Sequence, residues 1–307
     1  MCSFFWGGVC TSCTLCLSCT YFNAVVWCHL FETLCEIWAI CICSCRSSLL
    51  WPGVTIPLTG VILMEFFSWC VAALCFLLFP GLWGVVNNAG ILGFPADGEL
   101  LPMSTYRHCM EVNFFGAVEV SKTFLPLLRR SQGRLVNMSS MAGGIPLPRY
   151  AAYGASKAAL SMFSGVMRQE LSKWGIKVMA IHPSGFRTGI EGTAEQWDKQ
   201  EKELMENLPA DTRQAYGEEY LLGLRNYLLH LPSHCAPDLS PVLGSVLHAL
   251  LARRPQGLYT PGKGAYVPLC IFCCFPLWFY DFFISKVLSA GSVPRQLRAS
   301  GDESKNL

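Results

Sequence analysis

The sequence predicts an α/β fold, with a parallel sheet covered by helices, and three observations lead to this prediction. After residue 80, short apolar runs alternate with longer amphipathic stretches of helical length. Each apolar run ends in glycine, proline or small polar residues, as buried strands do. Strands that alternate with helices pair in parallel through right-handed crossovers. We therefore expect one such domain over residues 81–265, with its ligands beyond the carboxyl ends of the strands.

The predicted strands are short, apolar segments that end abruptly. The first ends in the turn sequence Asn-Asn-Ala-Gly at 87–90, and the third ends at Pro183. The four predicted strands cover residues 82–86, 134–140, 177–182 and 258–261.

The predicted helices carry apolar residues at spacings of three and four. In the first, over residues 103–130, Arg129 and Arg130 suit the negative end of the helix dipole, and Gly133 stops the helix. Gly175 closes the second helix in the same way. The other predicted helices cover residues 151–174, 198–230 and 241–254.

Residues 1–80 differ in composition from the rest of the chain. They hold 12 of the 17 cysteines but only four of the charged residues, although the whole chain has 23 Lys and Arg and 21 Asp and Glu. Two stretches, 21–43 and 54–80, approach the ~20 apolar residues that span a bilayer. We expect an apolar, helical segment that is either a membrane anchor or a non-native start of the chain.

Composition argues against two classes of ligand. Cys10, Cys13, Cys16 and Cys19 repeat at a spacing of three, but the run lacks the fourth-ligand spacing and the following proline of iron–sulfur motifs. We therefore expect no metal site. A net charge of +2 provides no concentrated basic surface, so we expect no nucleic-acid partner.

A third apolar stretch lies near the C-terminus, at residues 265–280. It contains Pro268 and Pro276, and it is too short and too interrupted to predict a membrane span. We expect residues 266–290 either to pack over a substrate pocket or to lie on a membrane surface. The polar tail, residues 291–307, is expected to be disordered.

Tyr153 and Lys157 are four residues apart on a predicted helix, so both side chains emerge on one face. A nearby ammonium stabilises a phenolate and lowers the phenol pKa from its ordinary value of about 10. Such a tyrosine can take a proton from an alcohol, and Ser140, at the end of the preceding strand, can hold the alcohol oxygen. No side chain accepts the hydride that leaves carbon, so this chemistry requires a nicotinamide cofactor.

Short motifs with the same chemistry follow one another along these elements. They are NNAG at 87–90, NFFG with Asn113, the pair Ser139 and Ser140, YGASK at 153–157 and PSGFRT at 183–188. In this order they resemble the short-chain dehydrogenase/reductase family over residues 81–265. The resemblance implies a Rossmann-like fold. Further stretches are similar to 17β-hydroxysteroid dehydrogenases, which implies NAD-dependent oxidation of a 17β-hydroxysteroid to the ketone. It also implies an endoplasmic reticulum membrane protein that dimerises through the helices at 103–130 and 151–173.

The resemblance also assigns a role to each motif residue. Tyr153 is the base, Lys157 lowers its pKa and holds the nicotinamide ribose, and Ser140 orients the substrate oxygen. Asn113 supports a water relay to Lys157. Two alternatives stay open: Asn113 bonds only backbone groups, or Ser139 takes the role of Ser140. The remaining cofactor contacts are assigned to Asn87, Ala89, Gly90, Pro183, Gly185 and Thr188.

Two features depart from the family pattern. No glycine-rich TGxxxGxG turn precedes NNAG, and Thr59 and Gly60 form the only Thr-Gly pair upstream. The first βαβ unit, which binds the cofactor pyrophosphate, is therefore expected to be missing, and the strand before NNAG is expected to be an unpaired edge. Ser184 stands where the family has glycine, and its side chain is expected to crowd the nicotinamide.

The missing turn leaves the activity open. We expect NAD to bind weakly or not at all, and NADP stays open because the residue that distinguishes the two belongs to the missing unit. The protein is then a steroid dehydrogenase, a retinol dehydrogenase-like enzyme, or an inactive membrane-associated paralogue or splice product that acts by dimerisation. Both enzyme hypotheses imply a small lipophilic alcohol or ketone as substrate.

Overall fold

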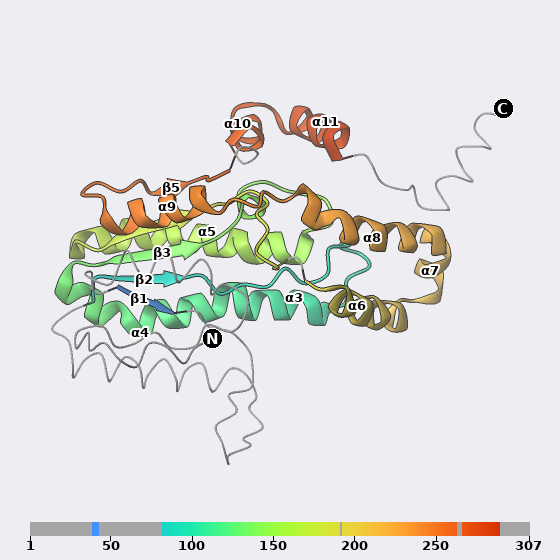
Figure 1. Ribbon diagram of the computed structural model, residues 1–307, viewed down its shortest axis with the longest axis horizontal. Helices are drawn as coiled ribbons and strands as arrows, with labels where there is room; N and C mark the ends of the chain where they lie inside the picture. Colours follow the sequence, from blue (N-terminus) through green and yellow to red (C-terminus); the bar gives the residue numbers. More distant parts are fainter. Residues whose placement is uncertain (1–38, 43–81, 191, 263–265, 289–307) are drawn as a thin grey trace, which may run out of the picture.

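The computed structural model describes residues 39–42, 82–190, 192–262 and 266–288 (Figure 1). Within these ranges a five-stranded sheet has the order β1-β2-β3-β4-β5, and all of its strands are parallel. The predicted parallel sheet is therefore confirmed. Its strands are β1 (Ala39–Ile42), β2 (Gly84–Asn87), β3 (Arg134–Met138), β4 (Lys177–Ile181) and β5 (Leu258–Tyr259).

The register of the sheet brings the ends of its central strands to one edge. Asn87 at the end of β2 pairs with Asn137 of β3, which pairs with Ala180 of β4. The motif residues that follow these strands therefore gather at the same carboxyl edge.

The edge of β2 differs from the sequence-based expectation of an unpaired strand. β1 pairs with β2 in parallel, from Ala39 opposite Gly84 to Ile42 opposite Asn87. An open edge presents unpaired N–H and C=O groups, and four residues of the apolar front segment satisfy them. The other predictions for residues 1–80, including the helical character and the cysteine run, lie outside the described residues.

Helices of very different lengths surround the sheet (Figure 1). The helix predicted over 103–130 contains a π-helical turn, η1, where the backbone bonds shift from four to five residues. The region predicted as one helix over 198–230 is divided at Pro209 and at Gly217, which has a φ of 77°. The helical segments are α3 (Met103–Met110), η1 (Glu111–Phe115), α4 (Gly116–Ser131), η2 (Met141–Gly143), α5 (Ala151–Leu171), η3 (Ser172–Trp174), α6 (Ala194–Asn207), α7 (Ala210–Tyr216), α8 (Glu218–His230), η4 (Leu231–His234), α9 (Ser240–Leu251), α10 (Tyr266–Cys274) and α11 (Leu277–Leu288).

The two faces of the sheet have separate cores. Val85 and Val178 pack on one face with the apolar residues of α4. Their neighbours Val86 and Met179 point to the opposite face, where they pack against α9. This alternation follows from the two-residue period of a strand, and it explains why the central strands are apolar throughout.

The C-terminal helices α10 and α11 form a hairpin that projects from the domain (Figure 1). The hydroxyl of the buried Tyr280 donates to the carbonyl of Pro146 at 2.5 Å, and Leu269 packs beside Ile145. The hairpin therefore rests on the loop at 141–147, which leads from β3 to α5. No helix in the described ranges combines the length and apolar character needed to cross a bilayer.

Candidate active site

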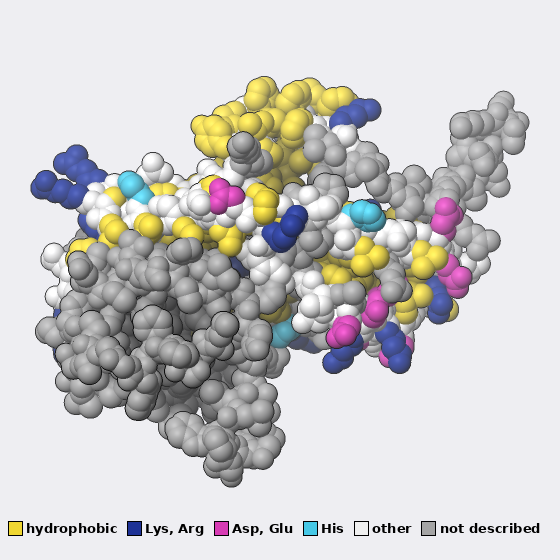
Figure 2. Space-filling view, viewed as in Figure 1, with side chains coloured by type: hydrophobic (Ala, Val, Ile, Leu, Met, Phe, Trp, Pro, Cys, Tyr) yellow, Lys and Arg dark blue, Asp and Glu magenta, His cyan; other side chains and the backbone are white. Residues whose placement is uncertain are grey.

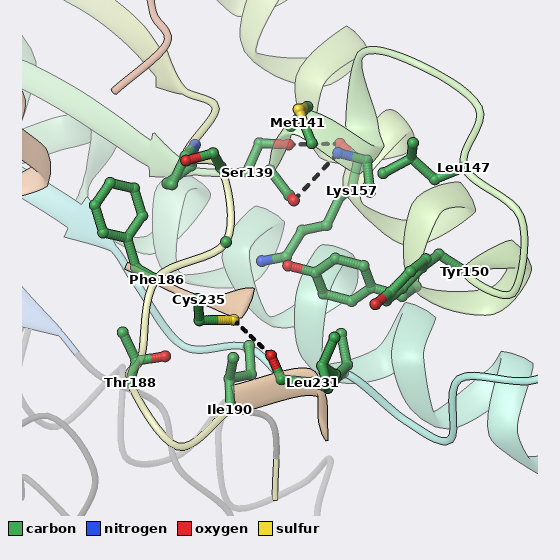
Figure 3. Close-up of a pocket in the computed structure, with 18 of the residues that line it drawn as sticks. Ser139, Met141, Leu147, Tyr150, Lys157, Phe186, Thr188, Ile190, Leu231 and Cys235 are labelled. Atoms are coloured by element: carbon green, nitrogen blue, oxygen red, sulfur yellow. Dashed lines mark hydrogen bonds between the residues drawn. The ribbon is translucent and has the colours of Figure 1, made fainter. Parts of the chain in front are cut away.

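A cavity of about 540 Å³ lies beyond the carboxyl ends of β2, β3 and β4 (Figure 3). The end of β3, the first turns of α5 and the loop at 183–190 form one side, and residues of α8 and α9 close the other. The cavity thus occupies the place where parallel α/β sheets bind their ligands.

Three of the predicted catalytic residues converge on this cavity. The hydroxyl of Tyr153 is hydrogen-bonded to Ser140. One turn along α5, the Nζ atom of Lys157 lies 5.9 Å from the centre of the Tyr153 ring and donates to the carbonyl oxygen of Met138 at 3.0 Å. Ser140, Tyr153 and Lys157 all line the cavity.

Burial shifts the pKa values of the two titratable residues toward their neutral forms. Burial raises the pKa of Tyr153 to about 12, although the hydrogen bond from Ser140 opposes this shift. Burial also lowers the pKa of Lys157 to about 8. The cost of burying a phenolate therefore outweighs the stabilising hydrogen bond from Ser140. The predicted effect of Lys157 on the pKa of Tyr153 stays a prediction.

Lys157 is held at its backbone as well as at its ammonium. Its carbonyl oxygen accepts hydrogen bonds from Ser139 Oγ at 2.9 Å and from Ser161 Oγ at 2.7 Å. Ser139 is buried and turned toward the α5 backbone, whereas Ser140 reaches Tyr153. This geometry favours Ser140 over Ser139 as the residue that orients the substrate oxygen.

Asn113 lies behind the cavity rather than in its wall. The amide Nδ2 donates to the carbonyl of Ile91 and to Ser156 Oγ, each at 2.9 Å, and Oδ1 accepts from the Ile91 N–H at 2.8 Å. Two of these contacts are to the backbone of Ile91, and the third is to the side chain of Ser156, so Asn113 does not bond backbone groups alone. The predicted water relay to Lys157 stays a prediction.

Gly90 fills the narrow space between Asn113 and Lys157. A Cβ atom at Gly90 would lie 3.0 Å from Lys157 Nζ and 3.2 Å from Asn113 Oδ1. Glycine is therefore the residue that lets this turn approach the lysine closely, and it lines the cavity.

The other two residues assigned to the cofactor floor are placed differently. The Asn87 amide points into the domain, where Nδ2 donates to Asn137 Oδ1 at 2.7 Å and to Ser121 Oγ at 2.9 Å. Neither Asn87 nor Ala89 is among the residues that line the cavity, whereas Asn88 is. Asn87 instead ties β2 to β3 and α4.

The loop at 183–188 supplies the remaining predicted contacts. Pro183, Gly185 and Thr188 line the same cavity as Tyr153. Backbone hydrogen bonds fix this loop: Ala236 N donates to Gly185 O at 3.0 Å, and Arg187 N donates to Ala236 O at 2.9 Å. The predicted contacts on either side of the cavity are therefore brought together.

Comparison with known proteins decides the family. Residues 70–199 match the family model for short chain dehydrogenases. The chain is 53% identical over 257 residues to human 17-beta-hydroxysteroid dehydrogenase type 2, an alignment that covers 83% of this chain and 65% of that protein. It is 47% identical to bovine 11-beta-hydroxysteroid dehydrogenase type 2, over 71% of this chain and 54% of that protein. The chain belongs to the short-chain dehydrogenase family. It spans less than two thirds of the length of these relatives.

Solved structures support the same fold. A short chain dehydrogenase from Burkholderia cenocepacia in complex with NADP has a TM-score of 0.53 and 19% identity, over 81% of this chain and 87% of that one. A short-chain dehydrogenase from Streptomyces avermitilis has a TM-score of 0.51 and 20% identity, over 79% of this chain and 77% of that one. The predicted Rossmann-like fold is thereby confirmed.

The described part of this short-chain dehydrogenase fits the nicotinamide end of a dinucleotide cofactor. Gly90 lets the turn approach Lys157 closely, Lys157 offers N–H donors there, and Gly185 and Thr188 border the same cavity. The segment that would bear a glycine-rich turn for the pyrophosphate lies outside the described residues.

The side chain of Ser184 lies partly in space beside Gly262, which reduces the crowding expected at the nicotinamide. A Cβ atom at Gly262, which has a φ of 104°, would lie 1.9 Å from Ser184 Oγ. The serine hydroxyl therefore occupies space that Gly262 leaves free. Ser184 nevertheless lines the cavity, and its effect on the nicotinamide stays a prediction.

A second polar region of the cavity was absent from the sequence-based prediction. Its side chains come from the loop before α5, from α8 and from the turn at 97, which no short motif connects. The one local signal in the sequence is the aromatic pair Tyr150 and Tyr153 at a spacing of three, which places both rings on the same side of a helix.

Proposed function

We propose that the protein oxidises a 17β-hydroxysteroid to the 17-ketone with NAD. The observation that carries this proposal is the contact of Ser140 and Tyr153, beside Lys157, at one end of a cavity with mostly apolar walls. The names of the relatives, which are hydroxysteroid dehydrogenases, favour a steroid over a retinoid. A lipophilic polycyclic alcohol suits a site of this kind.

In this proposal, the substrate hydroxyl bonds to the Ser140 and Tyr153 hydroxyls, and Tyr153 takes its proton. Lys157 and Gly90 hold the cofactor ribose side, and the nicotinamide, when bound, supplies the hydride acceptor. Because burial favours the neutral phenol of Tyr153, the rate of oxidation rises with pH above neutral.

The test is an assay of the purified full chain with estradiol, testosterone and retinol, each with NAD and with NADP. Formation of the 17-ketone with NAD supports the proposal. Oxidation of retinol alone supports the retinol dehydrogenase-like hypothesis. No turnover, together with no NAD binding in calorimetry, supports the inactive paralogue.

We also propose that the α10–α11 hairpin attaches the protein to the surface of the endoplasmic reticulum membrane. Apolar side chains cover this hairpin, and a lysine, Lys286, lies 5.8 Å from the Phe282 ring (Figure 2). Tryptophan and tyrosine beside apolar residues are typical of membrane interfaces. The large exposed side chains are Tyr266, Val267, Phe275, Leu277, Trp278 and Phe282.

Vesicle flotation and cell fractionation test this attachment. Trp278→Glu should reduce binding to phosphatidylcholine vesicles, whereas Trp174→Glu, at an exposed tryptophan far from the hairpin in sequence, should not. Equal binding of both variants would contradict a role for the hairpin.

The long helices support a homodimer, which we propose as the assembled state. Phe115, Met162 and Val166 are exposed on η1 and α5, and Phe114 packs on Phe163 with ring centres 6.2 Å apart. Light scattering tests this proposal: Met162→Glu should yield a monomer, and an unchanged dimer would place the interface elsewhere.

A further inference from the structure

The cavity contains a second polar region beside the catalytic residues. It consists of Arg149, Tyr150 and Tyr227, which we call the donor cluster. We propose that the donor cluster binds a second oxygen atom of the substrate, a hydrogen-bond acceptor distinct from the hydroxyl that reacts. This inference rests on the proposed alcohol oxidation, and it narrows the substrate class to lipophilic hydroxyketones and diols.

The two tyrosines of the donor cluster leave one hydrogen-bond donor free. Their hydroxyl oxygens are 3.0 Å apart, and either can be the donor. Two hydroxyls carry two protons, and the bond between them uses one. No further acceptor for the second proton is found among the described residues. Since both tyrosines line the cavity, this proton is available to a ligand there.

Arg149 adds further donors to the same place. Its guanidinium carbon lies 4.6 Å from the centre of the Tyr227 ring, and it is hydrogen-bonded to Tyr220. Neither ion pair in the described ranges includes Arg149. Tyr220 donates to Asp97 Oδ2, so this tyrosine links the arginine to the carboxylate. A guanidinium without a carboxylate partner retains N–H groups for an acceptor oxygen.

The backbone of Arg149 has a conformation that side chains rarely adopt. Its φ is 72°, in the left-handed region, and Gln132 is the other non-glycine residue with a positive φ in the described ranges. Gln132 caps a helix, where this conformation is common. Arg149 instead immediately precedes the N-cap of α5, and the conformation directs its side chain to Tyr227. Strain of this kind occurs where a side chain must be placed for binding.

The position of the donor cluster allows one ligand to reach it and the catalytic residues together. Tyr150 and Tyr153 are three residues apart, and their ring centres are 6.4 Å apart. Figure 3 shows Tyr150, Leu147 and Leu231 around the same cavity as Lys157. Donors surrounded by apolar side chains suit a carbon skeleton with an acceptor at a fixed place.

Matched ligands and a matched pair of variants test the inference. The ligands are two 17β-hydroxysteroids that differ only in whether a ketone is present at the far end, and their two 17-ketone products. Tyr227→Phe removes a hydroxyl of the donor cluster. Tyr216→Phe is the control, because its hydroxyl bonds to Glu99 at 2.9 Å and does not line the cavity.

We expect Tyr227→Phe to raise the KM about tenfold for the steroid with the ketone, with no change in kcat. The KM for the steroid without the ketone should stay the same. Tyr216→Phe should change neither. An equal rise for both steroids would overturn the inference, because loss of packing rather than of a hydrogen bond would explain it.

Arg149→Gly separates recognition from folding. Glycine adopts a φ of 72° without strain, which offsets the loss of the arginine contacts, so this variant should stay folded while it loses preference for the ketone-bearing steroid. Retained preference would overturn the role of Arg149.

Equilibrium binding of the two 17-ketones distinguishes this inference from the proposed function. The protein could show no turnover and still bind the ketone-bearing product more tightly than the other product. If Tyr227→Phe then removes this difference in binding, the role of the donor cluster is supported and the proposed oxidation is contradicted. Equal binding of both products, or binding of neither, overturns the donor cluster whatever the turnover.

Discussion

The two polar regions of the cavity are built in opposite ways. The predicted catalytic residues Ser140, Tyr153 and Lys157 come from one strand–helix unit, in which the Met138 carbonyl holds the Lys157 ammonium. The donor cluster joins Arg149 and Tyr150 to Tyr227 on α8, more than 70 residues away, and its contacts join side chains. The first region can be recognised from a local motif, whereas the second depends on how α8 packs. The proposed chemistry therefore depends on one strand–helix unit, whereas the proposed selectivity depends on how distant segments form the cavity wall.

The largest expected effect concerns Tyr153, in the predicted catalytic region of the cavity. Tyr153→Phe removes the hydroxyl that contacts Ser140 and should reduce kcat by about 10²- to 10⁴-fold, because proton transfer loses its base. Binding of the 17-ketone, measured by calorimetry, should change little. Retained turnover would contradict the assignment of the base, and an unchanged circular dichroism spectrum would exclude unfolding.

A pH titration of stability examines the burial of Lys157. The pKa of Lys157 is about 8 in the folded protein, whereas its ordinary value, which applies to the unfolded chain, is 10.5. Between pH 8 and 10.5 the unfolded chain therefore binds more protons than the folded protein. The free energy of unfolding should therefore rise from pH 8 to 10.5, by roughly 3 kcal/mol. Urea denaturation in detergent at several pH values measures this slope.

Lys157→Met is the control for this titration, because methionine fills a similar volume without a charge. The variant should lose the rise in stability between pH 8 and 10.5. A slope that persists in the variant would show that another group causes it.

The sequence predicted the parallel sheet, and the gathering of the motif residues at its carboxyl edge, for a physical reason. Strand periodicity and the order of the motifs are local properties, and parallel strands bring their carboxyl ends together whatever the rest of the chain does. The contacts of the Asn87 amide with Asn137 and Ser121 could not be predicted, because the motif does not specify which face of the turn the amide takes. The effect of burial on the pKa of Tyr153 could not be predicted either, because burial depends on the complete cavity.

The close approach at Gly90 gives a test of intermediate size. Gly90→Ala places a Cβ atom 3.0 Å from Lys157 Nζ, which must move, and kcat/KM should fall by about tenfold. Gly165→Ala on α5 is the control, because no atom lies within 4 Å of the added Cβ. Steady-state kinetics of both variants gives the result. Equal kinetics in the two would mean that Lys157 tolerates displacement.

The smallest expected effect concerns the pair Ser184 and Gly262 on the cofactor side. Ser184→Gly removes the hydroxyl that lines the cavity and should lower the KM for NAD by about twofold.

Gly262→Ala alone should be much more harmful, since its Cβ would lie 1.9 Å from Ser184 Oγ and its φ is 104°. In the double variant the clash disappears while the backbone strain remains, so the loss should be partly rescued. No rescue would mean that strain at Gly262, and not contact with Ser184, fixes glycine at this position.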